Sequence, residues 1–434
     1  MSPVAASSRR DRRLSSRNLS GSDSFEGPER LVWLNPAWLA LAAALGLSIM
    51  GIASISTTQE VGDFALPGRQ IAFALIGLFA ALAAAFIKPR TWCTWSYSLL
   101  ALAIALLLLL LIPFVPHFLV RPINGARRWI NLGLTDLQPS ELAKVAFVMA
   151  LAAYLRYRKN YRTLTGLLAP FAIMLIPMGL VLVEPDLGTA LLFPPALFSM
   201  LLAAGAKLRH LLIIGGCGAG TALLIAVISV SAAGRNPPTY PLLEKHQVDR
   251  ITALMNQIRG DTRQENTINY QGLKAVRLVG AGGMNGLGAD RARVIVAFNK
   301  LPLDYNDMIF AVVVNRFGFV GGALMIGLYF LFAAAMLGSA ALCRDPFGRL
   351  LCVGFTAFIL LQMCINMGET MGVLPITGTT LPFVSYGGSS MIVSFIMTGM
   401  VLGVALRPPA YFERASFEFG DDEPPDVLST MSGR

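Results

Sequence analysis

Carboxylates beside long apolar runs are the residues of this sequence that could do chemistry. Asp307 precedes such a run in YNDMIFAVVV, while Glu184 and Asp186 share a short EPD turn between two others. A carboxylate in a partly dehydrated setting has a raised pKa and could serve as a general base. Two carboxylates at one turn could instead bind a divalent cation or orient a sugar hydroxyl.

A purely structural role competes with function at two of these positions. Asp186 could cap the helix that follows it, and Asp307 could do the same, although Asn306 is also available as a cap. Glu184 has no such capping role. The residues themselves leave both interpretations open.

A second set of candidates lies in NGARRWINLGLTDLQPSELAK, at 124–144. Arg127 and Arg128 stand beside a tryptophan, which is typical of a membrane interface, and Arg can grip a phosphate through two parallel hydrogen bonds. Glu141 and Lys144 follow at a predicted helix start. An acid in the first turn and an i,i+3 ion pair are also ordinary helix chemistry, so a structural role is equally open for Glu141.

The chain as a whole is too apolar for an ordinary water-soluble fold. Of its 434 residues, 55% are hydrophobic and 14% charged, whereas about a quarter of an average soluble domain is charged. Ten runs are long enough to span a membrane, so we predict an all-α polytopic membrane protein with about ten transmembrane helices. Their predicted limits are 36–55, 69–87, 96–115, 140–155, 164–182, 188–206, 211–232, 307–337, 348–367 and 386–406.

The positive charges indicate how the spans are oriented. Lys and Arg are concentrated in the first tail and in alternate short connections, while the intervening connections 183–187 and 368–385 have none. Because positively charged short loops stay in the cytoplasm, we expect both termini there. The tails 1–35 and 407–434 are expected to be disordered around a membrane domain at 36–406.

The long segment 233–306 is then extracytoplasmic, and it is either a binding element or a flexible tether. Its GAGGMNGLG run lacks the residues of a nucleotide-binding loop and more plausibly forms tight turns, so no organic cofactor is expected. The five cysteines show no disulfide or zinc spacing. The net charge of +10 on so apolar a chain favours anionic lipid over nucleic acid as a partner.

Five motifs, in order, give the sequence a specific resemblance. NGARRWINLG with QPSELAK, EPDLGTA, DMIFAVV and LPITGTTLPFVSYGGSS are similar to the FtsW/RodA/SpoVE (SEDS) family of bacterial cell-wall polymerases, over about 36–406. The resemblance implies a ten-span helical protein that polymerises lipid II, the polyprenyl-linked disaccharide-pentapeptide. The family's essential acid lies in a segment usually reading HTDFIFA, so that role carries to Asp307.

The resemblance also implies a substrate site. We expect Asp307 to deprotonate the acceptor sugar hydroxyl, and cations to meet the charge that develops on the departing pyrophosphate, with Mg²⁺ or Mn²⁺ as a candidate aid. The metal ligands are unknown. The residues expected to bind the substrate are Arg127, Arg128, Glu141, Lys144, Glu184, Asp186, Arg250, Lys274 and Ser385.

Three departures from the family pattern surround Asp307. The family usually has LPE where this chain has LPL at 301–303, and EELG where it has Asn315, Arg316, Phe317 and Gly318. A glutamine common before the Gly-rich turn is replaced by Lys274. These changes place a metal ligand near the eighth span in doubt, but they retain Asp307.

The resemblance also bears on partners and on alternative functions. The resemblance implies a class B penicillin-binding protein transpeptidase and divisome or elongasome proteins as partners, in the bacterial inner membrane. The motifs do not separate a division from an elongation role, although the Arg-rich first tail and acidic last tail tilt the choice to division. A lipid II flippase or another transporter is the main alternative, but transporters place charges near the membrane midplane, whereas these charges gather at span ends. A non-catalytic scaffold for a transpeptidase is a third possibility.

Overall fold

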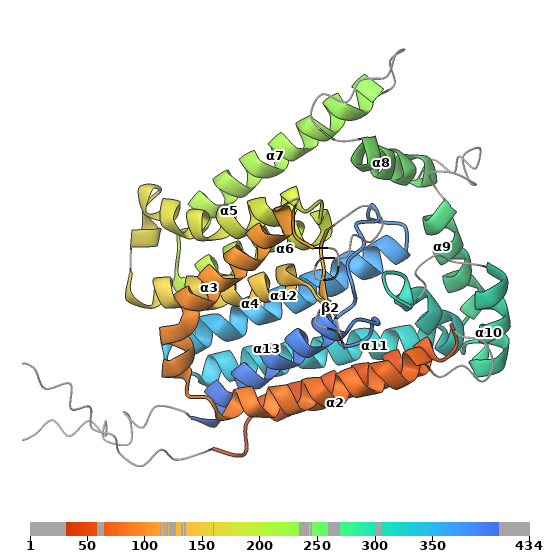
Figure 1. Cartoon of the computed structure of the whole chain (residues 1–434), viewed down its shortest axis with the longest axis horizontal. Helices are drawn as coiled ribbons and strands as arrows, with labels where there is room; N and C mark the ends of the chain where they lie inside the picture. The colour runs from red at the N-terminus through yellow and green to blue at the C-terminus, as the bar shows by residue number, and fades with distance from the viewer. Residues whose placement is uncertain are drawn as a thin grey trace, which may run out of the picture. The chain divides into compact units, whose positions relative to one another are not determined.

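Each of the ten predicted spans forms one helix in the computed structural model of this chain (Figure 1). The apolar runs dictate this outcome, because only a helix bonds all its backbone groups within one segment. The helices are α1 (Ala37–Ile55), α2 (Ala65–Phe86), α3 (Pro89–Leu111), α4 (Pro139–Tyr157), α5 (Leu168–Val183), α6 (Leu187–Ala204), α7 (Leu208–Ala233), α11 (Ile309–Leu342), α12 (Pro346–Thr370) and α13 (Gly388–Leu406).

The structure describes residues 32–407 apart from 59–64, 113, 117, 119, 121–126, 132, 134–135, 159, 234–242, 244, 259–269 and 300–304. The chain divides into two compact units, of which Val32–Pro408 contains all the described residues. The predicted disordered tails therefore lie almost wholly outside the described part. So does the LPL triplet at 301–303.

Within the described residues, nine helices are long and apolar enough to cross a membrane, and α4 is the tenth predicted span. With Glu141, Lys144 and Arg156, α4 is too charged to face lipid. It is instead almost entirely buried, and it packs against α3, α5, α12 and α13. The prediction of an all-α polytopic membrane protein is confirmed.

Small residues allow the helices to approach closely. Gly399 and Gly403, one turn apart on α13, pack directly on the backbone of Ala81 and Ala85, which are one turn apart on α2. A Cβ at Gly399 would collide with the Ala81 carbonyl group. Helix association in lipid depends on such packing, because lipid provides no hydrophobic drive between helices.

The described parts of 233–306 are helical and not a simple tether. They form α8 (Lys245–Ile258), α9 (Tyr270–Gly282) and α10 (Gly288–Asn299), and α9 packs against α11 and α12.

A small antiparallel pair of strands, β1 (Ile130–Asn131) and β2 (Asp136–Leu137), precedes α4. The described cysteines are all free thiols: Cys93, Cys217, Cys343, Cys352 and Cys364.

The Gly-rich turn between α9 and α10 forms backbone hydrogen bonds with an interruption in helix α11. The 34 residues of α11 would be about 51 Å long if straight, which exceeds a bilayer core of about 30 Å. Gly318, with φ 71° and ψ −171°, interrupts the helix. At this break Phe319 N–H donates to Gly283 O at 2.8 Å and Leu287 N–H to Asn315 O at 3.0 Å. The predicted tight turns are confirmed, and they fix the short helix 309–317 at the start of α11.

We expect Gly286→Ala to destabilise the protein more than Gly288→Ala does. Both glycines have a positive φ, of 78° and 74°, so each alanine pays a backbone cost of about 1–2 kcal/mol. Only at Gly286 would the new Cβ also collide with the backbone of Arg316 and Gly318, whereas Gly288 has open space. Thermal unfolding of the two purified variants measures the difference, and equal Tm values would refute the backbone contact.

Candidate functional site

The site is built on the irregular segment 371–387 between α12 and α13, called here the site segment. It holds the turn that precedes α11: Asn366 Nδ2 donates to Asp307 O at 2.8 Å and to Thr379 O at 2.6 Å. Ser385 Oγ donates to Asn306 O at 2.7 Å. The site segment and the Asp307 turn therefore form one hydrogen-bonded body.

Asp307 presents a free carboxylate at this place. Its side chain is 8% exposed and accepts no hydrogen bond within the described part of the chain. The residue that caps α11 is Met308, without a side-chain bond, so neither Asn306 nor Asp307 acts as the cap. Burial raises the pKa of Asp307 to about 6, and the charge of Asp186 adds to the rise, whereas Arg250 and Arg128 oppose it. Such a pKa suits a general base near neutral pH.

Helix α8 brings a cation to the same place. Arg250 Nη1 donates to the carbonyl oxygen of Thr377 in the site segment at 3.3 Å. Burial lowers the pKa of Arg250, as does Arg128, while the carboxylates of Glu369, Asp307 and Asp186 raise it. The predicted loop cation thus lies among the acids of the site.

The two carboxylates of the EPD turn, Glu184 and Asp186, have different hydrogen-bond partners. Asp186 caps α6 by accepting from Thr189 N–H at 3.3 Å, and its other oxygen accepts from Gln138 and Ser140, each at 3.1 Å. The capping interpretation therefore describes Asp186. Its hydrogen bonds join α6 to the start of α4.

Glu184 has a different environment from Asp186. It is buried, and its Oε1 has no hydrogen-bond partner in the described part of the chain. Burial, and then the neighbouring charge of Asp186, raise the pKa of Glu184 to about 8, against the opposing effect of Arg128. At neutral pH Glu184 is therefore mainly a protonated acid that can donate a hydrogen bond.

The two adjacent arginines diverge. Arg128 reaches the EPD turn, where Nε donates to Glu184 O at 3.0 Å and Nη2 donates to Pro185 O. Arg127 turns to the end of α3 and donates to Ile112 O at 2.9 Å. Of the pair, Arg128 is the one whose charge acts on Asp307.

Glu141 and Lys144 form a buried ion pair of 2.9 Å at the start of α4. Lys144 Nζ also donates to Gln362 Oε1 at 2.9 Å, and Gln362 Nε2 donates to Thr380 O at 2.8 Å. The pair is therefore the structural i,i+3 ion pair that the sequence allowed. Through Gln362 of α12, Lys144 is also linked to the site segment.

Two further predicted binding residues have structural contacts. The Ser385 hydroxyl bridges Leu381 N–H and Asn306 O, both at 2.7 Å, within the body that carries Asp307. The Lys274 amine donates to the carbonyl group of Asn299 and so links α9 to α10. No described bond brings Lys274 to the Asp307 carboxylate.

Polar residues inside apolar helices were missed as site residues by sequence reasoning. They are fully or nearly fully buried and supply the hydrogen bonds of the site segment, and their signal was polarity within a span. They are Gln70 on α2 and Gln362, Asn366 and Glu369 on α12.

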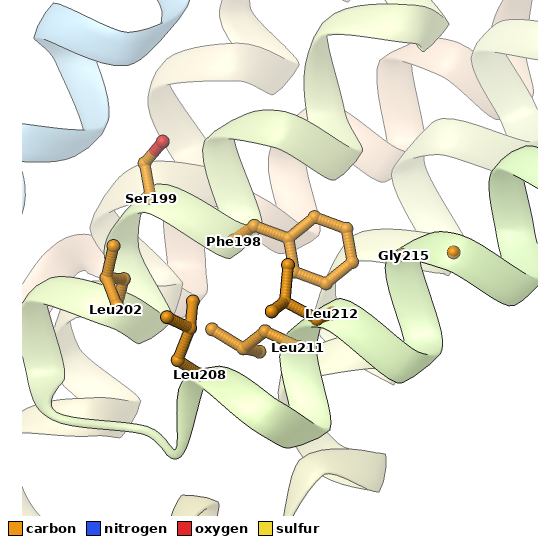
Figure 2. Close-up of a pocket in the computed structure, with 8 residues that line it drawn as sticks. Phe198, Ser199, Leu202, Leu208, Leu211, Leu212 and Gly215 are labelled. Carbon is orange, nitrogen blue, oxygen red and sulfur yellow. The ribbon is translucent and has the colours of Figure 1, made fainter.

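A separate apolar pocket of about 320 Å³ lies between α6 and α7 (Figure 2). Phe198, Leu202, Leu208 and Leu212 line it, and none of its lining residues is ionisable. The stretch of α6 from Asp186 to Phe198 is about 18 Å long, so the pocket is remote from the EPD turn. It suits an apolar chain and cannot carry the chemistry.

The described donor set does not fit a metal ion held by the protein. No group of three His, Cys, Asp or Glu side chains among the described residues could hold one. Asp186 accepts three hydrogen bonds, and Glu369 accepts from Thr377, Gly378 and Thr379. No catalytic step is therefore assigned to Mg²⁺ or Mn²⁺.

The chain as a whole is similar to known proteins. The family model FtsW/RodA/SpoVE, described as "Cell cycle protein", matches residues 32–408. The chain belongs to the FtsW/RodA/SpoVE family. Two relatives illustrate the likeness: a probable peptidoglycan glycosyltransferase FtsW of Alkalilimnicola ehrlichii, 33% identical over 87% of this chain and 89% of that protein, and stage V sporulation protein E of Bacillus subtilis, 32% identical over 86% and 97%.

A solved structure agrees with this family assignment. A chain from a peptidoglycan synthase complex, solved to explain how polymerization and crosslinking are coordinated, is 29% identical with a TM-score of 0.68. The match covers 86% of this chain and 98% of that chain. The family fold thus extends over nearly all of the described residues.

The family departures near Asp307 have packing roles here. Asn315 is fully buried and its Nδ2 donates to Leu278 O of α9 at 2.9 Å. Arg316 donates to the Ala53 carbonyl group and, at 3.1 Å, to Ser56 Oγ at the end of α1. Where the family has two acids, this member has side chains that tie α11 to α9 and α1.

We expect Lys144→Met to cost about 3–5 kcal/mol of unfolding free energy, because it leaves the Glu141 carboxylate buried without its cation. The double variant Glu141→Gln with Lys144→Met should recover most of that loss. Tm measurements on purified protein compare the two.

Arg156→Met is the matched control on the same helix. It removes the Arg156–Asp345 pair, 3.2 Å apart with both side chains 25% exposed, and should cost about 1 kcal/mol or less. A Lys144→Met variant no less stable than Arg156→Met would contradict the buried pair's role.

Proposed function

We propose that this protein is a peptidoglycan glycosyltransferase that polymerises lipid II into glycan strands, with Asp307 as the catalytic base. The observation that carries the proposal is the Asp307 carboxylate, which is buried, accepts no hydrogen bond from any described residue and lies within range of the charges of Arg250 and Arg128. Family membership and the glycosyltransferase activity named for its relatives support the same reaction.

The proposed step is a displacement at the anomeric carbon of the lipid-linked strand. Asp307 takes the proton of the GlcNAc 4-hydroxyl of the acceptor lipid II, and that oxygen forms the new glycosidic bond. The bond from the anomeric carbon to the pyrophosphate oxygen breaks, and undecaprenyl pyrophosphate leaves with the electron pair. A base contributes typically about 10²–10⁴-fold to such a step.

The cations of the site would stabilise the departing pyrophosphate. Arg250 and Arg128 are the two whose charges act on Asp307, and Arg can bind phosphate oxygens through paired hydrogen bonds. Protonated Glu184 can donate to a phosphate or sugar oxygen in the same region. Arg127 donates to Ile112 O at the end of α3, and Lys274 donates to Asn299 O of α10.

The setting of the reaction follows from the charge pattern and the family. With both termini in the cytoplasm, α8, α9, α10 and Asp307 lie on the outer side of the bacterial inner membrane. The complex in which a structural relative was solved supports a crosslinking partner, and we propose a class B penicillin-binding protein together with divisome or elongasome proteins.

Asp307→Asn should abolish polymerisation of lipid II by purified protein. Asp290→Asn, an exposed acid on α10, is the control and should retain activity. Gel analysis of polymer formed from labelled lipid II provides the measurement. Substantial polymer from Asp307→Asn would sink the base assignment, and lipid II movement across liposomes without any polymer from the wild type would favour a flippase.

The same substitution should not lower stability at pH 8. Because the folded pKa of Asp307 is raised, to about 6, ionisation opposes folding above that pH, and the opposition disappears as pH falls below the unfolded value of about 3.9. Asn mimics the protonated form. We expect the Tm of Asp307→Asn to equal or exceed that of the wild type at pH 8, with the gap closing towards pH 4.

The rate should depend on pH through the same group. A base must be deprotonated, so we expect kcat/KM to fall as pH drops through about 6. A pH series of initial rates, at constant ionic strength, tests this. An acid limb near pH 4, the ordinary range of an exposed carboxyl group, would mean that Asp307 is not the titrating base.

A further inference from the structure

Glu369, near the end of α12, is a buried acid to which the proposed step gives no role. It is 0% exposed. Its Oε1 accepts from the hydroxyl groups of Thr377 and, at 3.4 Å, Thr379, and its Oε2 accepts from Gly378 N–H at 3.4 Å. All three donors belong to one turn of the site segment, 377–379, called here the seat turn.

The seat turn lies between Glu369 and the Asp307 carboxylate. Gly378 has φ +83°, and the position that a Cβ would occupy there is 3.4 Å from Asp307 Oδ2. The Asp307 carboxylate therefore lies against the backbone of Gly378, whose N–H donates to Glu369. A shift of the seat turn would change this contact.

Two other parts of the site contact the seat turn. Arg250 donates to Thr377 O at 3.3 Å. Gly188, two residues after Asp186, packs so closely that a Cβ there would lie 2.5 Å from Thr379 Cγ2 and 3.0 Å from Thr377 Oγ1. The position of the seat turn therefore fixes the relative positions of Asp307, Arg250 and the start of α6.

We propose that Glu369 is a positioning residue of the glycosyl transfer described above: it holds the seat turn, and through that turn it fixes the Asp307 base and the Arg250 cation. The inference rests on the proposed function. Glu369 itself touches no substrate, because both of its oxygens are engaged by the seat turn.

Glu369→Gln provides the test, since it keeps the shape of the side chain and removes its charge and one acceptor. Displacement of a reacting group by about 1 Å can cost about 100-fold, so we expect kcat to fall by about 10-fold to 100-fold. KM for lipid II should change by less than about threefold, because the loss lies in the placement of the base.

A second substitution removes a donor and keeps the acid. Thr377→Val removes one hydrogen bond to Glu369, so kcat should fall, and Thr377→Ser should restore it. Thr356→Val is the matched control, because the described bond of its hydroxyl group stays within α12, to Cys352 O at 2.7 Å. That control should leave kcat unchanged.

Wild-type kcat in Glu369→Gln would overturn the proposal. So would equal losses in Thr356→Val and Thr377→Val, because these would reflect general loosening of α12. If Glu369→Gln does not fold, the Thr377 series decides, and wild-type kcat in Thr377→Val overturns the proposal. Failure of the proposed function is seen separately, as the absence of polymer from the wild type in the same assay.

Discussion

An irregular backbone inside an apolar bundle must find its hydrogen-bond partners within the protein, and this constraint governs the whole site. Segment 371–387 lies among helices, where lipid can offer neither donor nor acceptor. Side chains from two helices supply what is missing: Gln70 donates to Ser385 O at 2.9 Å, Gln362 to Thr380 O and Asn366 to Thr379 O. An unpaired buried polar group costs several kcal/mol in lipid, so these residues cannot be replaced freely.

Supporting that segment from several helices requires close packing. Gly51 of α1 lies against the backbone of Val384, and Gly188 of α6 lies against the threonines of the seat turn. The break at Gly318 lets the short helix 309–317 end at the site while the rest of α11 crosses the membrane. Asp307 is then held by its backbone, through Asn366, so its carboxylate is left free for a proton.

The sequence predicted the ten membrane helices well, but it predicted the roles of the individual charged residues poorly. Ten apolar runs became ten helices, and Asp307 was singled out by its motif. Asp186 was left open between two roles and proved to be a cap. Arg127 and Arg128 look equivalent in the sequence, yet the structure shows Arg127 donating to Ile112 O and Arg128 to the EPD turn. Glu369 carried no assigned role, because its donors are supplied by the fold of a Gly/Pro-rich segment.

What the sequence determined by itself was the environment: apolar runs of span length require helices in a membrane, and charges placed at their ends mark where chemistry can occur. Tertiary structure alone decided which charges are satisfied. Glu141 and Lys144 form an ion pair, Asp186 accepts hydrogen bonds from its neighbours, and Asp307 is buried with no hydrogen-bond partner for its carboxylate among the described residues. The reason is physical: satisfaction of a buried charge depends on contacts between segments far apart in the chain, and no local pattern records those contacts.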